Sequence, residues 1–256
     1  MNIETIAVAI FALLVPALAC YKKVLSPFAS LLALIMVFAA QTVGNRYAVF
    51  LLAEFLFISL IDKICKKRID YADKNIIQKT GTRDVIQVFA NGGVALLSVI
   101  IWHLSKRSIF LMCFTASLIE SFGDSAASSI GIAANKQTFD VLRMKKMDPG
   151  LSGGISIPGT FACAISCSMM AILSHLMNIS GSIRESCLLM IAAFGGCIFD
   201  SILGAAFQRK EKCTRCGIIT EKKVHCNTQT LYYSGCKWLT NDVIAPVACH
   251  RTALSA

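Results

Sequence analysis

Four carboxylates lie inside apolar stretches of the sequence, where charged side chains are rare: Glu54, Glu120, Asp124 and Asp200. A charge inside a membrane costs several kcal/mol, so such residues are functional candidates by default. Glu120 and Asp124 are four residues apart and therefore share one helix face. Carboxylate oxygens are the ligands that Mg²⁺ prefers. We predict a magnesium site on Asp124 and Asp200, with Glu120 as a further ligand, and leave Glu54 out because its apolar stretch is short.

Two amide side chains, Gln87 and Asn91, begin another apolar stretch. Placed in antiparallel helices, they would lie at a depth similar to that of Asp124 and Asp200. We therefore expect these four residues to converge in one inward-facing cavity. The alternative is a buried polar network that only joins the helices.

A glycine-rich loop, residues 148–160, precedes a further apolar stretch. Its glycines include Gly150, Gly153, Gly154 and Gly159. Glycine lets the backbone approach a ligand closely, and free amides ahead of a helix form an anion-binding nest. The sequence is not a Walker A motif, because no Gly-Lys-Ser/Thr follows. A re-entrant loop and tight helix packing remain open as alternatives.

Cysteines cluster near the C-terminal end, where Cys213 and Cys216 form C-x-x-C and His225 and Cys226 follow. Zn²⁺ prefers four thiolate or imidazole ligands, and a C-x-x-C knuckle closed by a second pair provides them. We predict a structural zinc site on these residues, with Cys236 as the alternative to His225. A redox pair or free thiols are the other interpretation. The cysteines within the apolar stretches, among them Cys113, Cys163, Cys167 and Cys197, are interpreted as small packing residues.

The elements that position these residues are membrane helices. The chain has 256 residues, of which 55% are hydrophobic and 16% charged, and its mean hydropathy is +0.64. A soluble domain carries about a quarter charged residues, and a disordered chain is poor in apolar ones. We predict an all-α membrane bundle of about seven helices, with six to eight allowed because an eighth could begin near Val243. The expected spans are 5–21, 26–43, 47–61, 85–104, 109–134, 155–177 and 187–207.

The distribution of basic residues predicts the orientation. With the N-terminus outside, all but four of the 25 Lys and Arg residues fall on the inner side. This asymmetry follows the positive-inside rule and accounts for the net charge of +10 without nucleic acid. We expect a multi-pass protein of a bacterial-type plasma membrane whose site faces the cytoplasm. Its parts would be a membrane domain (1–207), a cytoplasmic zinc-ribbon-like segment (208–242) and a tail or degraded last helix (243–256).

Several segments together carry a resemblance: Arg83–Asn91, Asp124–Gly131, Pro149–Thr160, Phe199–Gln208, the cysteine segment and Trp238–Asp242. They resemble motifs of the domain-of-unknown-function 92 family, which includes the transmembrane protein 19 group and plant phytyl-phosphate kinase. The resemblance covers about residues 83–242. Two positions depart from the family pattern: Ser129 stands in place of a glutamate, and Ser125 in place of a threonine.

The resemblance implies phosphoryl transfer from a nucleoside triphosphate, with CTP as one candidate, to a prenyl monophosphate. Such chemistry needs Mg²⁺ and positive charge on the phosphates. The resemblance implies catalytic roles for Asp124, Asp200, Arg83 and Asn91. It implies phosphate or nucleotide contacts for Gln87, Ser125, Ser128, Gly153, Gly154, Ser156, Thr160, Asn241 and Asp242.

Two other functions remain open at this stage. Intramembrane carboxylates and helix-interrupting glycines also suit a transporter or flippase for a phosphorylated lipid or a small anion. The presence of Ser129, where the family pattern has a glutamate, is also compatible with an inactive membrane scaffold. The expected partners are a prenyl-phosphate lipid, a nucleoside triphosphate and membrane lipids, with a homo-oligomer left open.

Overall fold

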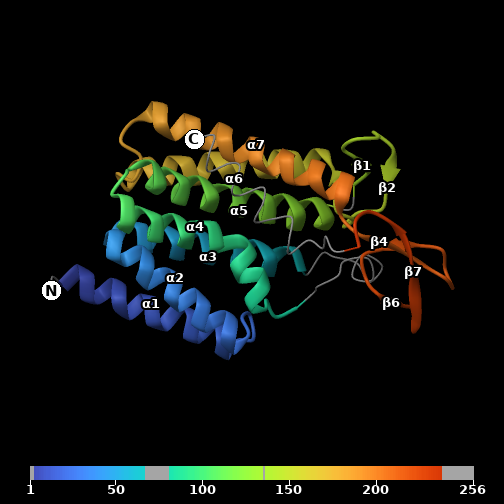
Figure 1. Cartoon of the computed structure of the whole chain (residues 1–256), viewed down its shortest axis with the longest axis horizontal. Helices are drawn as coiled ribbons and strands as arrows, with labels where there is room; N and C mark the ends of the chain where they lie inside the picture. The colour runs from blue at the N-terminus through green and yellow to red at the C-terminus, as the bar shows by residue number, and fades with distance from the viewer. Residues whose placement is uncertain (1–2, 67–80, 135, 238–256) are drawn as a thin grey trace.

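Seven helices make up most of the computed structural model, which describes residues 3–66, 81–134 and 136–237 (Figure 1). Each of the seven predicted apolar stretches forms one of them. Their bounds are α1 Ile3–Tyr21, α2 Pro27–Val43, α3 Asn45–Lys66, α4 Val85–Ser105, α5 Ile109–Ala133, α6 Ile157–Leu176 and α7 Ile183–Phe207.

Five of these helices, α1, α4, α5, α6 and α7, are long and apolar enough to cross a membrane. The apolar α2 is shorter, at 17 residues. Helix α3 has 22 residues and extends beyond its predicted range, and it includes the charged residues Asp62, Lys63 and Lys66 in its last turns. The described residues thus contain seven helices at the predicted positions, of which five meet the length and composition of a membrane span. The eighth helix expected near Val243 lies outside the described residues.

The expectation of a purely α-helical chain is wrong in one respect, because two small sheets lie together at one end of the bundle (Figure 1). Backbone outside the apolar stretches must still satisfy its N–H and C=O groups, and strand pairing does so. A three-stranded antiparallel sheet, β2-β1-β3, contains part of the glycine loop. A four-stranded sheet, β5-β4-β7-β6, holds the cysteine segment. The strands are β1 Thr138–Asp140, β2 Lys146–Met147, β3 Gly154–Ile155, β4 Lys210–Cys213, β5 Ile219–Thr220, β6 Val224–His225 and β7 Thr228–Ser234.

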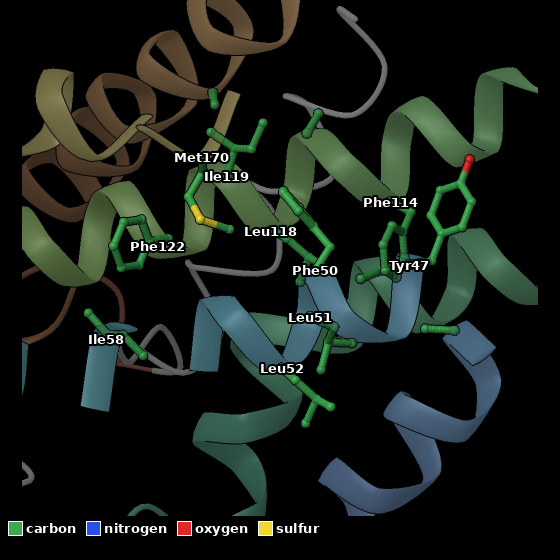
Figure 2. Packing of buried hydrophobic residues seen from close by; sticks show 14 of the residues in the cluster. Tyr47, Phe50, Leu51, Leu52, Ile58, Phe114, Leu118, Ile119, Phe122 and Met170 are labelled. Atoms are coloured by element: carbon green, nitrogen blue, oxygen red, sulfur yellow. The ribbon is translucent and has the colours of Figure 1, made fainter. Parts of the chain in front are cut away.

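Helix α5 lies at the centre and packs against α3, α4, α6 and α7. Its buried side chains and those of α3 form much of the core, which Figure 2 shows where α3 and α6 meet α5. Phe114 and Phe122 of α5 are almost completely buried. The Phe114 ring meets Tyr47 of α3 edge to face, with 5.7 Å between the ring centroids, an arrangement that aromatic pairs favour.

Close contact between α5 and α6 depends on glycine. A Cβ on Gly159 would lie 3.0 Å from the carbonyl oxygen of Ala127, and Gly131 faces Gly159 across the contact. Small residues at such contacts let membrane helices approach closely. Ser156 begins α6 as its N-cap and accepts a hydrogen bond of 3.2 Å from the Gly159 amide. The start of α6 is therefore held directly against α5.

We expect Phe114→Ala to lower the free energy of unfolding by about 3 kcal/mol, because it leaves a cavity beside Tyr47. Phe161→Ala on α6 is the matched control, since that ring is 66% exposed and its removal leaves no internal cavity. Thermal unfolding in detergent measures both. Equal destabilisation by the two variants would contradict the central position of α5.

Candidate functional site

The main cavity has a volume of about 240 Å³ and is enclosed by α5, α6, α7 and the loop before α6. It lies toward the sheet end of the bundle. Seven of the predicted site residues line it together: Asp124, Ser128, Gly153, Gly154, Ser156, Thr160 and Asp200. Residues that the sequence analysis did not select, among them Ser201 of α7 and Glu221 after β5, line it as well.

Two carboxylates face this cavity from different helices, Asp124 from α5 and Asp200 from α7. They interact electrostatically with each other. The Oδ1 atom of Asp200 is buried and has no hydrogen-bond partner among the described residues. A buried carboxylate oxygen without a partner is costly unless a cation or donor satisfies it. The donor set, two carboxylates with serine and threonine hydroxyls beside them, fits a hard cation such as Mg²⁺.

The glycine loop packs directly on α7. Gly153 has φ +81°, and a Cβ there would lie 2.4 Å from the Cα of Ala205, so only glycine fits. Two neighbouring amides are already used: the Ser152 amide donates to Glu221 Oε1 at 2.7 Å, and the Gly154 amide donates to the Leu151 carbonyl at 3.1 Å. The expectation that the Gly154 amide is free to hold a phosphate therefore needs correction, although the residue lines the cavity.

The prediction that Gln87 and Asn91 share one cavity with Asp124 and Asp200 is wrong. Arg83, Gln87 and Asn91 line a second cavity of about 60 Å³ together with Glu54. Helix α5 lies between α4 and α7 (Figure 1) and packs against both, which separates these residues from Asp200. Glu54, which the sequence analysis set aside, lies in the middle of α3 and belongs to this second group.

Gln87 has a structural role at the start of α4. Its side chain accepts a hydrogen bond from the Asp84 amide, while the Asp84 carboxylate accepts one from the Gln87 amide. This is a reciprocal capping box, and the Asp84-x-x-Gln87 spacing ahead of an apolar stretch is a signal from which it could have been predicted.

Arg83 is paired with a carboxylate that the sequence analysis missed. Its guanidinium lies 2.6 Å from Asp62 Oδ2, and the Ser129 hydroxyl donates to Asp62 Oδ1 at 2.6 Å. Asp62 belongs to α3, Ser129 to α5 and Arg83 to the segment before α4. This group therefore ties three parts of the bundle together beside the second cavity.

Other predicted site residues lie outside the main cavity. Glu120 is buried one turn before Asp124 and is not among the residues that line the cavity. Ser125 is not among them either, because it follows Asp124 and points about 100° further around the helix. Asn241 and Asp242 lie outside the described residues.

Positive side chains are missing from the wall of the main cavity, since none of its described lining residues is Lys or Arg. The nearby Lys210 on β4 is buried and interacts electrostatically with Asp140 and Glu221. Burial lowers the pKa of Lys210 and raises that of Glu221. An anion in the cavity would therefore depend on a bound cation, amides and hydroxyls for its stabilisation.

The cysteine segment brings four metal-binding side chains together: Cys213, Cys216, His225 and Cys226. Their ligand atoms lie within 4.8 Å of one another, and His225 Nδ1 is 3.4 Å from Cys216 Sγ and 3.2 Å from Cys226 Sγ. The amide of Cys216 contributes most to lowering the pKa of Cys213, to about 6, which favours the thiolate that binds metal. This donor set fits Zn²⁺, and His225 rather than Cys236 belongs to it.

The comparisons with known proteins agree with a membrane protein. The family described as integral membrane protein DUF92 matches residues 10–253. Protein PGR of Arabidopsis thaliana is 28% identical over 203 residues, which cover 68% of each chain. Protein VTE6, chloroplastic, of the same plant is 28% identical over 65% of this chain, but the match spans only 43% of that protein. An uncharacterized membrane protein of Methanocaldococcus jannaschii is 24% identical over 65% of this chain and 67% of its own. No solved structure matches.

We expect Cys216→Ala to remove about one equivalent of zinc from the full chain, because a three-ligand remnant no longer closes the tetrahedral site. Elemental analysis of protein purified with limiting Zn²⁺ measures this loss. Cys236→Ala is the matched control, since its exposed thiol lies outside the ligand group. Equal zinc content in both variants would show that the four residues do not hold the metal.

Proposed function

The chain belongs to the integral membrane protein family DUF92, and from this premise we propose that it is a Mg²⁺-dependent phosphotransferase. It would transfer a phosphoryl group from a nucleoside triphosphate, such as CTP, to a prenyl or phytyl monophosphate. The motif resemblance to the family that includes phytyl-phosphate kinase supports the substrate class. The observation that carries the proposal is that Asp124, Asp200 and the glycine loop line one cavity.

Asp124 and Asp200 would hold the Mg²⁺ ion. When bound, this ion neutralises charge on the phosphate oxygens of the donor. Asp200 Oδ1, which is buried and has no hydrogen-bond partner among the described residues, would be available as a ligand of the ion. Since no described residue lining the cavity is Lys or Arg, the proposed chemistry depends on these two side chains more than on Arg83, which lines the other cavity.

The remaining lining groups suit the phosphate end of a nucleotide. Ordinary small-molecule pockets have volumes of about 300–1,000 Å³, and this cavity has about 240 Å³. It therefore fits phosphates, while the base and ribose would lie outside it. The hydroxyls of Ser128 and Thr160 can donate to phosphate oxygens, and the N-terminus of α6 adds its partial positive charge.

The acceptor needs no strong base. A prenyl monophosphate is already anionic, and one of its oxygens attacks the γ-phosphorus in line. The bond to the bridging oxygen breaks, and the nucleoside diphosphate leaves with that electron pair. The products are a prenyl diphosphate and the diphosphate nucleotide.

A groove on the outer face of α6 provides a place for the prenyl tail. It is lined by apolar and small residues, among them Ala164, Ile165 and Ser168. Thr160 lines the main cavity, and Ala164 and Ser168 follow at intervals of four, so all three share one helix face. A lipid could thus lie along α6 with its phosphate at Thr160 and its tail against the groove.

The same proposal places the sheet end on the cytoplasmic side. The connection between α1 and α2, which contains Lys22 and Lys23, and the hairpin of β1 and β2, which contains Lys145 and Lys146, lie toward that end (Figure 1). The positive-inside rule assigns such basic segments to the cytoplasm. Nucleoside triphosphates are cytoplasmic, so the site would face its donor.

The direct test is transfer from labelled CTP or ATP to a panel of prenyl monophosphates by the full chain in nanodiscs. We expect wild type to form prenyl diphosphate and both Asp124→Asn and Asp200→Asn to lose at least about 100-fold in rate, since each removes charge needed by the cation. Asp148→Asn is the control, because that exposed carboxylate lies in the same loop region but outside the cavity.

Absence of product from folded wild-type protein across the panel would overturn the kinase proposal for these substrates. Movement of an unchanged phospholipid or anion across the membrane would then identify a transporter. Activity retained in both aspartate variants would contradict the proposed site while leaving the reaction class in place.

We further propose that Asp62 supplies to Arg83 the carboxylate that the family motif places at position 129. Asp62→Asn breaks a hydrogen-bonded ion pair and should lower the free energy of unfolding by about 2 kcal/mol. Adding Ser129→Glu to that variant should recover part of the loss, because Ser129 lies beside the same ion pair. Thermal unfolding compares the two, with Ser129→Ala as the control for the single hydroxyl. If the double variant is no more stable than Asp62→Asn, the proposal that Asp62 replaces the family carboxylate at position 129 is contradicted.

A further inference from the structure

Three thiols gather inside the membrane domain, away from the cysteine segment. Cys163 and Cys167 are four residues apart on α6 and share one face, and Cys197 reaches them from α7. Their sulfur atoms all lie within 4.8 Å of one another, and all three residues are buried. The sequence analysis treated them as separate packing residues, because nothing in their spacing joins Cys197 to the other two.

Helix α5 leaves room for the three sulfurs. A Cβ on Gly123 would lie 2.5 Å from Cys167 Sγ, 3.2 Å from Cys197 Sγ and 3.5 Å from Cys163 Sγ. The thiols therefore occupy the space beside a glycine, where any side chain on α5 would displace them. Helices α5, α6 and α7 thus bring the three sulfur atoms together beside one glycine.

The ordinary hydrogen bonds of these thiols are weak. Cys167 Sγ donates to the Ile119 carbonyl at 3.9 Å, and Cys197 Sγ donates to the Glu120 carbonyl at 3.4 Å. A thiol is a poor donor, so little is lost if a metal replaces its proton. The carboxylates of Glu120 and Asp124 interact electrostatically with the group, which favours a positively charged occupant.

A cation can reach the group from the main cavity. Cys163 and Cys197 line that cavity together with Asp124 and Asp200. A metal site needs such an entry path as well as its ligands.

We propose that Cys163, Cys167 and Cys197 form a binding site for a thiophilic divalent cation of the class of Zn²⁺ and Cd²⁺. Thiolates select such soft or borderline cations, whereas Mg²⁺ prefers oxygen. Each coordinated thiol gives up its proton to water through the cavity, and no oxidation state changes. The fourth position would be taken by water. The proposal does not depend on the kinase activity, although the two sites would share the cavity wall.

The test uses the full chain in detergent, reduced and then loaded with ¹¹³Cd²⁺, with cadmium NMR as the readout of thiolate-bound metal. The background is Cys213→Ala/Cys216→Ala, which disables the cysteine segment. We expect one thiolate-bound cadmium signal to remain in this background and to disappear when Cys167→Ala is added. Cys113→Ala is the matched control, because Cys113 on α5 is buried like the three proposed ligands but does not belong to their group.

Absence of a thiolate-bound signal from the background variant would overturn the proposal. So would a signal that survives Cys167→Ala, since the metal would then lie elsewhere. A second measurement leaves the cysteine segment unchanged. By elemental analysis, wild-type protein should bind one equivalent more cadmium than the Cys167→Ala variant. Equal binding would contradict the site.

Discussion

The burial of two carboxylates, Asp124 and Asp200, beside one cavity is the constraint on which the candidate site depends. The packing of α5 against α7 brings the two carboxylates to one cavity, where a low dielectric strengthens the interaction of like charges. No lysine or arginine among the described residues lines that cavity, and Asp200 Oδ1 lacks a partner there. A bound cation would supply the missing positive charge and a partner for Asp200 Oδ1. A polyphosphate that enters the cavity needs the same positive charge.

The glycine loop connects this cavity to the cysteine segment. Gly153 lies against the backbone of Ala205 on α7, so the loop cannot move without disturbing that helix. Glu221, which follows β5, accepts the hydrogen bond of the Ser152 amide and also lines the cavity. The cysteine segment is thereby joined to the loop through the Glu221 carboxylate. A structural zinc ion would stabilise the wall of the cavity without taking part in the chemistry.

Much of this arrangement follows from the sequence. Long apolar runs predict the helices, and the carboxylates within them identify the cavity, because burying a charge in a membrane needs a reason. The separation of Asn91 from Asp200 could not be predicted, since it depends on which helices α5 packs between. The pairing of Asp62 with Arg83 and the meeting of Cys197 with Cys163 likewise join distant residues. Local sequence patterns contain no information on such contacts. The capping box of Asp84 and Gln87 is different, because its two residues are three positions apart and it could have been predicted from the sequence.

The central claim is that Asp124 and Asp200 form one cation site. Mn²⁺ can stand in for Mg²⁺, and electron paramagnetic resonance of the free ion counts how many equivalents the full chain binds. The account predicts one site in wild-type protein that is lost in Asp124→Asn and in Asp200→Asn and is kept in Asp148→Asn. Unchanged Mn²⁺ binding in both cavity variants would contradict it, because the two carboxylates would then be a buried polar contact and not a metal site.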